Sequence, residues 1–427
     1  MIVILHSKLL RYNLNKIIMK KSQFKLMLSG CLMSAVMLAS CGGSTSNQGN
    51  AAANKDTSCN QQCKKEFCNG IKAADFDATI DGKKTGLYTL KNAKGTQVQI
   101  TNLGGRIVSI VLNDKNGEPK DVVLGFDKVT TYADSVNHPS DFGASIGRYA
   151  NRINKGKIVC DKKTIQLPLN NFGHCLHGGP NGWQYKVYDV VSSSDKELVL
   201  LMDSPDGDMK FPGNVKATVK FTLDDNNVIT IDYTATTDKQ TVINMTNHSY
   251  FNLNGDPNQP INNHLIYVNA DNYTPVDATY MPTGKIESVE GLAFDCRQEK
   301  EIGERITNND AAHQQIKFGN GFDHNWCLNT YKDGKGDDTQ VAASIYSPVT
   351  GIKLDVYTNE PGIQVYSGNF LDGSAIGKKG IAYKQHAGIC LETQKYPNSP
   401  NVKAWPSPYL NPGETYHSVC KFAFSVK

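Results

Sequence analysis

From about residue 73 onward, the chain is built of short runs in which apolar and polar residues alternate. In Val228–Thr236 the apolar face consists of Ile229, Ile231, Tyr233 and Ala235. A period of two is the pattern of a strand with one buried face. Seven further runs predict strands in the same way: Gly86–Leu90, Gln97–Thr101, Ile107–Asn113, Leu198–Met202, Val215–Leu223, Val341–Ser347 and Ile352–Thr358.

Turn signals separate these runs. Paired turn residues occur at Asn116-Gly117, Asp206-Gly207, Asp224-Asp225 and Asp333-Gly334, and such pairs favour hairpins. Helices are expected only at Val129–Tyr132 and Gln298–Ile302, and we find no internal repeat or second domain boundary. The pattern predicts an all-β domain over residues 73–427, folded as a large antiparallel β-sandwich.

The N-terminal segment has a different character. Basic residues precede an apolar stretch from Phe24 to Ala39, which ends in Leu38-Ala39-Ser40-Cys41. We interpret residues 1–41 as a lipoprotein signal segment, with residues 1–18 as an extension upstream of a second candidate start, Met19. A membrane-spanning anchor is the alternative, but the apolar run is short for a span. The expected location is therefore lipid-anchored at Cys41, facing the periplasm on the outer membrane of a Gram-negative-type bacterium.

Residues 42–72 are rich in Gly, Ser, Asn, Ala and Gln, which predicts a flexible tether. Three of the 11 cysteines, Cys59, Cys63 and Cys68, lie in it. Exported proteins can form disulfides. A local disulfide or free thiols are favoured over a metal site, because no fourth ligand follows at a suitable spacing.

The formal net charge of +4 comes from the signal segment. Residues 1–41 contain six Lys or Arg and no acid, so the rest of the chain carries about −2. A mildly acidic domain has no electrostatic footprint for nucleic acid. The glycine-rich nucleotide loops, the serine hydrolase elbow and the zincin helix motif are all absent from the sequence.

Candidate chemistry is concentrated in polar segments that place ionisable groups beside glycines or aromatics. A sugar site needs this mixture, because aromatics cover the apolar faces of the ring and charged groups bind its hydroxyls. The segments are Gly147–Ile153, Leu176–Gly179, Met245–Leu253, Gly321–Trp326 and Leu391–Gln394.

Together with Pro361–Tyr366, these segments resemble the motifs of the aldose 1-epimerase (galactose mutarotase) family, and they occur in the family's order. The resemblance runs from about Gly86 to the C-terminus. It implies a galactose mutarotase-like supersandwich with the sugar in an open cleft on one sheet. The implied activity interconverts the α and β anomers of a free aldohexose such as glucose or galactose, without a cofactor.

The resemblance also implies roles for individual residues. Glu392 would be the general base at the anomeric hydroxyl, and His248 the general acid at the ring oxygen. The remaining implied residues bind the sugar or support the site: Arg152, His177, Asp323, Asn151 and Gln364. One carboxylate and one imidazole can move both protons of this reaction near neutral pH.

Each residue also has a structural interpretation. Taken alone, His248 is more typical of a hydrogen-bonded structural histidine, and Glu392 of a half-buried, paired carboxylate. The complete motifs favour catalysis for both. Arg148 and His324 are interpreted as structural or supporting residues. Whether Trp183 and Trp326 flank the sugar or fill the core stays open.

A metal site is an alternative interpretation of two of the histidines. His174 and His177 are three residues apart, but Gly178-Gly179 indicates a loop and no nearby carboxylate completes a ligand set. No metal is therefore expected.

Three other functions compete with the epimerase. A related epimerase could act on a pentose or a hexose phosphate, but no Arg or Lys cluster marks a phosphate site. A glycoside hydrolase would need Asp323 and Glu392 as its two carboxylates and would leave His248 without a role. A sugar-binding lipoprotein would need neither Glu392 nor His248. We expect a monomer whose only partner is a small sugar, and the preferred aldose stays open.

Overall fold

The computed structural model describes residues 69–137, 140–307 and 314–427. The predicted signal segment, the lipidation site Cys41 and the cysteines of the tether lie outside this range, so they remain predictions. Within the described ranges, no helix is both long and apolar enough to cross a membrane.

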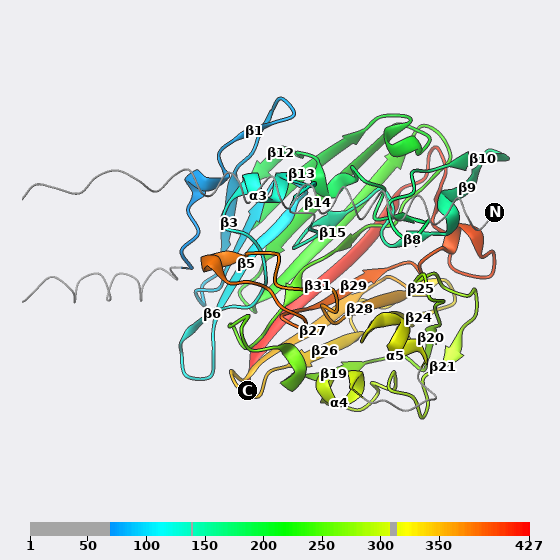
Figure 1. Cartoon of the computed structure of the whole chain (residues 1–427). Coiled ribbons are helices and arrows are strands. Elements are labelled where there is room, and N and C mark those ends of the chain that lie inside the picture. Colours follow the sequence, from blue (N-terminus) through cyan, green and yellow to red (C-terminus); the bar gives the residue numbers. More distant parts are fainter. Residues whose placement is uncertain (1–68, 138–139, 308–313) are drawn as a thin grey trace, which may run out of the picture. The chain divides into compact units, whose positions relative to one another are not determined.

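The largest sheet is antiparallel and runs in the order β12-β13-β14-β15-β31-β27-β26-β19-β22 (Figure 1). Its strands are β12 Asp189–Ser193, β13 Glu197–Ser204, β14 Val215–Leu223, β15 Val228–Thr237, β31 Tyr416–Val426, β27 Ile352–Thr358, β26 Ala343–Tyr346, β19 Leu265–Val268 and β22 Lys300–Glu301. The C-terminal strand β31 lies at its centre, between β15 and β27.

Two further antiparallel sheets complete the sandwich. One has the order β18-β29-β28-β23-β20-β21, with β18 Tyr250–Phe251, β29 Ile389–Gln394, β28 Gly362–Tyr366, β23 Asp323–Cys327, β20 Asn272–Thr274 and β21 Glu287–Ser288. The other has the order β3-β4-β5-β6, with β3 Leu87–Lys91, β4 Gln97–Thr101, β5 Arg106–Asn113 and β6 Pro119–Asp121. The first of these two carries most of the site described below.

Short ribbons and helical turns connect the sheets. The two-stranded ribbons are β1 Thr79–Ile80 with β2 Lys83–Lys84, β7 Ser145–Ile146 with β17 Thr246–Asn247, β8 Arg152–Ile153 with β11 Cys175–Leu176, β9 Lys157–Cys160 with β10 Lys163–Gln166, β16 Thr241–Val242 with β30 Tyr409–Leu410, and β24 Tyr331–Lys332 with β25 Lys335–Gly336. The α-helices are α3 Val129–Ala133, α4 Ile302–Ile306 and α5 Gln314–Gly319. The 3-10 helices are η1 Ala73–Phe76, η2 Asn154–Gly156, η3 Trp183–Tyr185, η4 Asp208–Lys210, η5 Ile261–Asn263, η6 Lys378–Gly380 and η7 Ser399–Asn401.

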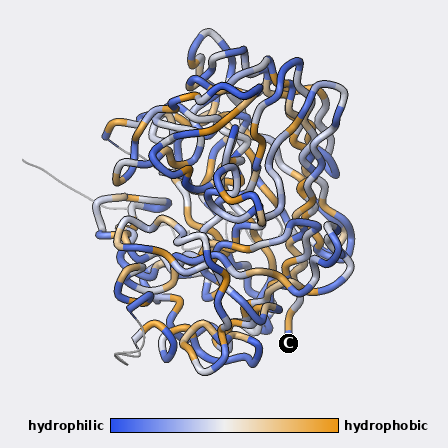
Figure 2. The backbone as a smooth tube through the Cα atoms, turned by 90° about the vertical axis from the view of Figure 1, so that its right-hand side faces the viewer, coloured by the Kyte–Doolittle hydropathy of each residue, from blue (hydrophilic) through white to orange (hydrophobic). Residues whose placement is uncertain are grey.

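The main core lies between the nine-stranded sheet and the other two sheets. Residues from all three belong to one buried apolar cluster, for example Ile231, Ile363 and Ile107. Figure 2 shows apolar and polar segments alternating along the tube, as strands with one buried face require. In β15 the predicted apolar face is the buried one: Ile229, Ile231 and Tyr233 are fully buried.

The all-β prediction is confirmed, and the predicted bounds of β4, β14 and β27 match the structure. The hairpin predicted at Asp333-Gly334 joins β24 to β25. Both turn residues have positive φ, 52° and 78°, as a two-residue hairpin turn of the primed type requires.

The helix predicted at Gln298–Ile302 is wrong. Lys300 and Glu301 instead form β22, which pairs with β19, and the helix begins only at Ile302. Pairing with a sheet edge overrides local helix propensity at this point. Helix α5 was not predicted.

The cysteines of the described domain are Cys160, Cys175, Cys296, Cys327, Cys390 and Cys420. All six are buried and free. Burial raises the pKa of their thiols, as it does for Cys175 to about 12. A buried, protonated thiol is chemically inert, so none of these six residues is expected to be reactive.

A buried ion pair fastens η6 to the four-stranded sheet. Lys378 Nζ lies 2.7 Å from Asp121 Oδ2 and donates to Val108 O at 3.0 Å, and the two charged side chains are 8% and 15% exposed. Because Lys378→Met leaves the Asp121 carboxylate buried and unpaired, we expect urea denaturation at pH 7 to show about 3 kcal/mol less stability.

The control for this prediction is Lys196→Met, which breaks the exposed pair with Asp225. Exposed pairs contribute less than about 1 kcal/mol. Equal losses in the two variants would show that the Lys378 pair contributes no more than a surface contact.

Candidate active site

A cavity of about 490 Å³ opens on the face of the six-stranded sheet that points away from the main core. Its lining combines carboxylates, imidazoles, one guanidinium and aromatic rings: Asp141, Asn151, Arg152, Asn171, Phe172, Leu176, His177, His248, Tyr250, Asp323, Tyr366, Phe370 and Glu392. Six of the seven residues predicted to form or support the site line this cavity, although they are spread along the chain from residue 151 to residue 392: Asn151, Arg152, His177, His248, Asp323 and Glu392.

Strand alternation and register place the groups that come from the sheet. In β29, Ile389 and Leu391 face the core, so Cys390 and Glu392 face the other way. Gln364 on β28 pairs directly with Glu392, and Asn325 on β23 pairs with Gln364. Same-face neighbours on adjacent strands stand side by side. The sheet therefore presents a row of polar side chains to the cavity side.

Glu392 and His248 face each other in the cavity as a carboxyl group and an imidazole. The Glu392 Oε1 to His248 Nε2 distance is 3.4 Å, and the two side chains are 2% and 6% exposed. Glu392 is therefore fully buried rather than half-buried as predicted. Burial raises its pKa to about 7, with Asp323 and Asp141 adding to the rise and His248 and Arg152 opposing it. A carboxyl with this pKa can accept and return a proton near neutral pH.

His248 lies in a break between β17 and β18, where its backbone bonds Ala144 and Gly143 rather than a continuous ladder. Its ring stacks on Tyr250 at a centroid distance of 5.1 Å. Its Nδ1 lies 3.5 Å from Cys390 Sγ. With Nδ1 held by the sulfur, the other nitrogen, Nε2, faces Glu392 and the cavity.

His177 is held as a neutral hydrogen-bond donor. It follows β11 in the predicted loop, with φ of 50°, and Gly178 and Gly179 also have positive φ. Its Nδ1 accepts the backbone N–H of Asn151 at 3.1 Å, so the ring proton is on Nε2. Burial lowers the pKa of His177 to about 3. The side chain therefore offers an N–H to the cavity without a charge.

Arg152 and Asp323 supply further charged groups of the cavity. Arg152 Nε donates to Asn171 Oδ1 at 3.1 Å, and its guanidinium lies 5.0 Å from the centre of the Tyr280 ring. Asp323 Oδ1 accepts from Gln364 Nε2 at 2.7 Å. Gln364 does not line the cavity, so its contact with the site passes through Asp323.

The open question about the tryptophans is settled in favour of the core. Trp183 packs on Gly147, and Trp326 donates its indole N–H to Phe294 O, and neither lines the cavity. Arg148 binds the Pro212 and Gly213 carbonyls from a fully buried position. It is structural, as expected.

His324 is also structural, because it is buried with Nε2 beside Gln315 Oε1. His174 does not approach His177 as a ligand partner. Its ring nitrogens contact the Lys155 backbone N–H and Thr279 Oγ1 instead.

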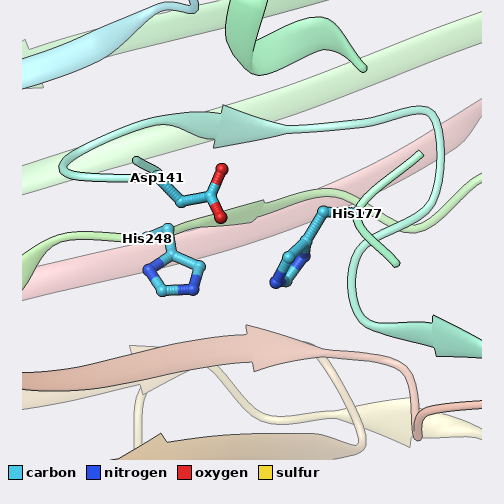
Figure 3. Close-up of side chains that lie close together, drawn as sticks. All are labelled: Asp141, His177 and His248. Carbon is cyan, nitrogen blue, oxygen red and sulfur yellow. The ribbon is translucent and has the colours of Figure 1, made fainter. Parts of the chain in front are cut away.

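Asp141 is the main residue of the cavity that sequence analysis missed. Its carboxylate lies between the two imidazole rings of His177 and His248 (Figure 3), and their donor atoms are all within 4.8 Å of one another. The statement that no carboxylate lies near His177 is therefore wrong. The residue stands six positions before Gly147-Arg148, in a segment without any motif or periodicity, so no sequence signal pointed to it.

These three residues have the composition of a metal site, but the hydrogen bonding of His177 opposes it. Ligation through Nε2 would require the ring proton to move to Nδ1, which already accepts the Asn151 N–H. A second set of donors, His248, Cys390 and Glu392, also lies within 4.8 Å. Burial raises the pKa of the Cys390 thiol well above its ordinary value, which disfavours the thiolate that a metal needs.

The aromatic wall was missed as well. Tyr250 and Tyr366 belong to the segments singled out in the sequence, and their strand positions could have assigned them to the cavity face. Phe172 and Phe370 are 61% and 52% exposed. Solvent-exposed aromatics in loops have no periodic signal, so only the three-dimensional arrangement reveals them.

A buried carboxyl and imidazole 3.4 Å apart, beside further polar groups and aromatic rings on a β-sandwich, are the groups that an isomerase acting on sugars needs. The family model of aldose 1-epimerase matches residues 86–423. The chain belongs to the aldose 1-epimerase family, and its activity is that of an aldose 1-epimerase.

Relatives and solved structures agree with this assignment. The galactose mutarotase of Sus scrofa is 41% identical over 330 residues, covering 77% of this chain and 91% of the relative. The aldose 1-epimerase of Escherichia coli is 37% identical over 346 residues, covering 81% and 96%. The crystal structure of an aldose epimerase homologue from C. elegans superposes with a TM-score of 0.72 at 30% identity, covering 80% and 99%.

Proposed function

We propose that Glu392 and His248 interconvert the anomers of free aldohexoses such as glucose and galactose by opening and reclosing the ring. The observation that carries the proposal is the buried Glu392–His248 pair, whose facing atoms are 3.4 Å apart. The anomeric hydroxyl and the ring oxygen share one carbon, so the two groups that exchange protons with them must stand close together.

The reaction begins with Glu392 ionised and His248 as the imidazolium. Glu392 removes the proton of the anomeric hydroxyl while His248 protonates the ring oxygen, and the C1–O5 bond breaks to give the open aldehyde. Rotation about C1–C2 exposes the other face of the carbonyl. The C5 hydroxyl then attacks C1, returning its proton to His248 while Glu392 protonates the carbonyl oxygen. The enzyme ends in its starting protonation state.

The remaining residues bind and orient the sugar. His177 donates its Nε2–H on the ring-oxygen side, beside His248, at a ring centroid distance of 5.2 Å. Arg152 donates to hydroxyls, and Asp323, held by Gln364, accepts from them. Asn151 fixes the His177 tautomer through its backbone N–H. Tyr250 and Tyr366 cover the apolar faces of the ring.

Polarimetry tests the activity directly. Freshly dissolved α-D-glucose and α-D-galactose are followed with and without the purified protein lacking residues 1–41. We expect faster approach to the equilibrium rotation on at least one sugar. If neither sugar nor any other free aldose responds, free aldoses are not the substrate.

The pH dependence of catalysis is a further expectation. Because the base must be ionised and burial raises the pKa of Glu392 to about 7, kcat/KM should rise with pH through a midpoint near 7. Below the midpoint the rate falls about tenfold per pH unit. Polarimetry between pH 4.5 and 8.5, corrected for the uncatalysed rate, measures this limb. A midpoint near the ordinary value of 4.5 would contradict the role of a buried Glu392.

We also propose that the protein is exported, lipidated at Cys41 and held on the periplasmic side of the outer membrane, where it meets sugars released outside the inner membrane. The support is the sequence of residues 1–41 and the tether that follows. Palmitate labelling should be lost in Cys41→Ala, and globomycin should block processing. Unchanged labelling in the variant would refute lipidation at this residue.

We also propose that the monomer is the active form. Sedimentation equilibrium of the purified protein tests this point.

A further inference from the structure

A second, smaller hollow of about 130 Å³ adjoins the main cavity. The two share Asp141, Tyr250 and Phe370 as lining residues. The side pocket, as we call it, is otherwise lined on its polar side by Ser140, Asp372 and Ser374. None of the roles assigned above uses it.

The side pocket offers acceptors and hydroxyls, and none of the described residues lining it is Lys or Arg. Asp372 is ionised, because bonds from the hydroxyl and backbone N–H of Ser374 lower the pKa of its carboxyl. Ser140 Oγ and Asp141 Oδ1 are buried and have no hydrogen-bond partner among the described residues. Buried polar atoms need a partner. A neutral ligand carrying a hydroxyl donor would provide one, and an anion would be repelled.

The position of the side pocket relative to the reacting atoms can be inferred from the groups that surround His248. The carboxylates of Glu392 and Asp141 both approach this ring, but they belong to separate groups of neighbouring donors, with His248 common to both. In an aldohexose, the ring oxygen likewise stands between two carbons. One is C1 with the anomeric hydroxyl, and the other is C5 with the exocyclic hydroxymethyl group. If Glu392 lies at the anomeric hydroxyl and His248 at the ring oxygen, the C5 side of the sugar lies away from Glu392, and Asp141 is the second carboxylate near His248 on that side.

We propose that the side pocket is a subsite for the exocyclic hydroxymethyl group of an aldohexose, and that Asp141 accepts the hydrogen bond of its hydroxyl. This inference rests on the proposed function, because it uses the same orientation of the sugar. Asp141 is then a specificity-determining residue. It favours hexoses over pentoses and 6-deoxyhexoses, and its charge rejects sugars with a phosphate at carbon 6.

The expected size of the preference for aldohexoses is set by the hydrogen bond from the sugar's exocyclic hydroxyl to Asp141. A hydrogen bond to a charged acceptor discriminates by roughly 10- to 100-fold against a ligand that lacks the donor. D-Glucose and 6-deoxy-D-glucose differ only in that hydroxyl, so the ratio of their kcat/KM values isolates it. D-Xylose, which lacks the whole group, and D-glucose 6-phosphate, which adds a dianion, test the shape and charge of the subsite.

The experiment measures kcat/KM by polarimetry for these four sugars with the wild-type protein, Asp141→Asn, Asp141→Ala and Asp195→Asn. Asp195 is an exposed carboxylate in the turn between β12 and β13, so its variant controls for the loss of one charge. We expect the ratio of glucose to 6-deoxyglucose to be at least tenfold in the wild type and in Asp195→Asn. It should fall to about one in Asp141→Ala, and Asp141→Asn should discriminate less against glucose 6-phosphate. Circular dichroism confirms that each variant is folded.

Three outcomes separate the possibilities. A wild-type protein inactive on every aldose would refute the proposed function itself. An active wild type with equal rates on glucose and 6-deoxyglucose would overturn the subsite alone. A preference that survives unchanged in both folded Asp141 variants would remove Asp141 from the recognition of the hydroxyl. The ratio reports recognition, because a purely structural defect lowers both rates together.

Discussion

Replacing Glu392 by Gln lowers kcat by about 10²–10⁴-fold and at the same time makes the protein more stable at pH 8. The rate falls because an amide of the same shape cannot take the proton of the anomeric hydroxyl. Stability rises because the ionised carboxylate is buried, at 2% exposure, with only partial compensation from His248 and Arg152. A residue that destabilises the folded protein but is needed for the reaction is retained for its function.

The sign and pH window of the stability effect follow from linkage. The pKa of Glu392 is about 7 in the folded protein, against an ordinary value of 4.5, so the folded state binds this proton more tightly than the unfolded state. The wild type therefore loses stability as pH rises from 4.5 to 7, and the Gln variant lacks this loss. Urea denaturation should show a gain of about 1–3 kcal/mol at pH 8 and none near pH 4.

The matched control for this variant is Glu118→Gln, at an exposed turn position. It should leave both the rate and the stability near wild type. If Glu392→Gln were less stable than the wild type at pH 8 and fully active, Glu392 would be a paired structural carboxylate, which was the competing interpretation of the sequence.

His248→Asn is expected to lower kcat by a similar factor of about 10²–10⁴. The Asn side chain still donates a hydrogen bond near the ring oxygen, but it cannot transfer a proton. A second effect distinguishes this variant. The charge of His248 lowers the pKa of Glu392, so its loss should move the rising limb of kcat/KM to higher pH.

His417→Asn is the control for this second prediction, because His417 is 51% exposed and pairs with Asp232 on the nine-stranded sheet. Glu392→Gln/His248→Asn should be hardly slower than either single variant, since the two groups act as a unit. Rates that multiply across the double variant would contradict a coupled acid and base.

The sequence predicted the sheets well and the site in part. Alternation in β14 and β15 is visible because each strand has one face in the core, and the site residues within motif segments could be named individually. Asp141, Phe172 and Phe370 could not, because loop residues are placed by tertiary contacts that leave no periodic trace. The helix predicted near Gln298 is wrong for a related reason. Lys300 and Glu301 pair with β19, and this tertiary contact is not visible in the local sequence.

The central place of β31 in the nine-stranded sheet has a consequence for biosynthesis. This strand leaves the ribosome after every other strand described, yet β15 and β27 each pair with it along most of their lengths. Until it emerges, the nascent chain holds two unpaired, apolar edges, which are prone to aggregation. A chain whose largest sheet closes only when its last strand is available stays unfolded longer during synthesis, which would suit the export proposed above.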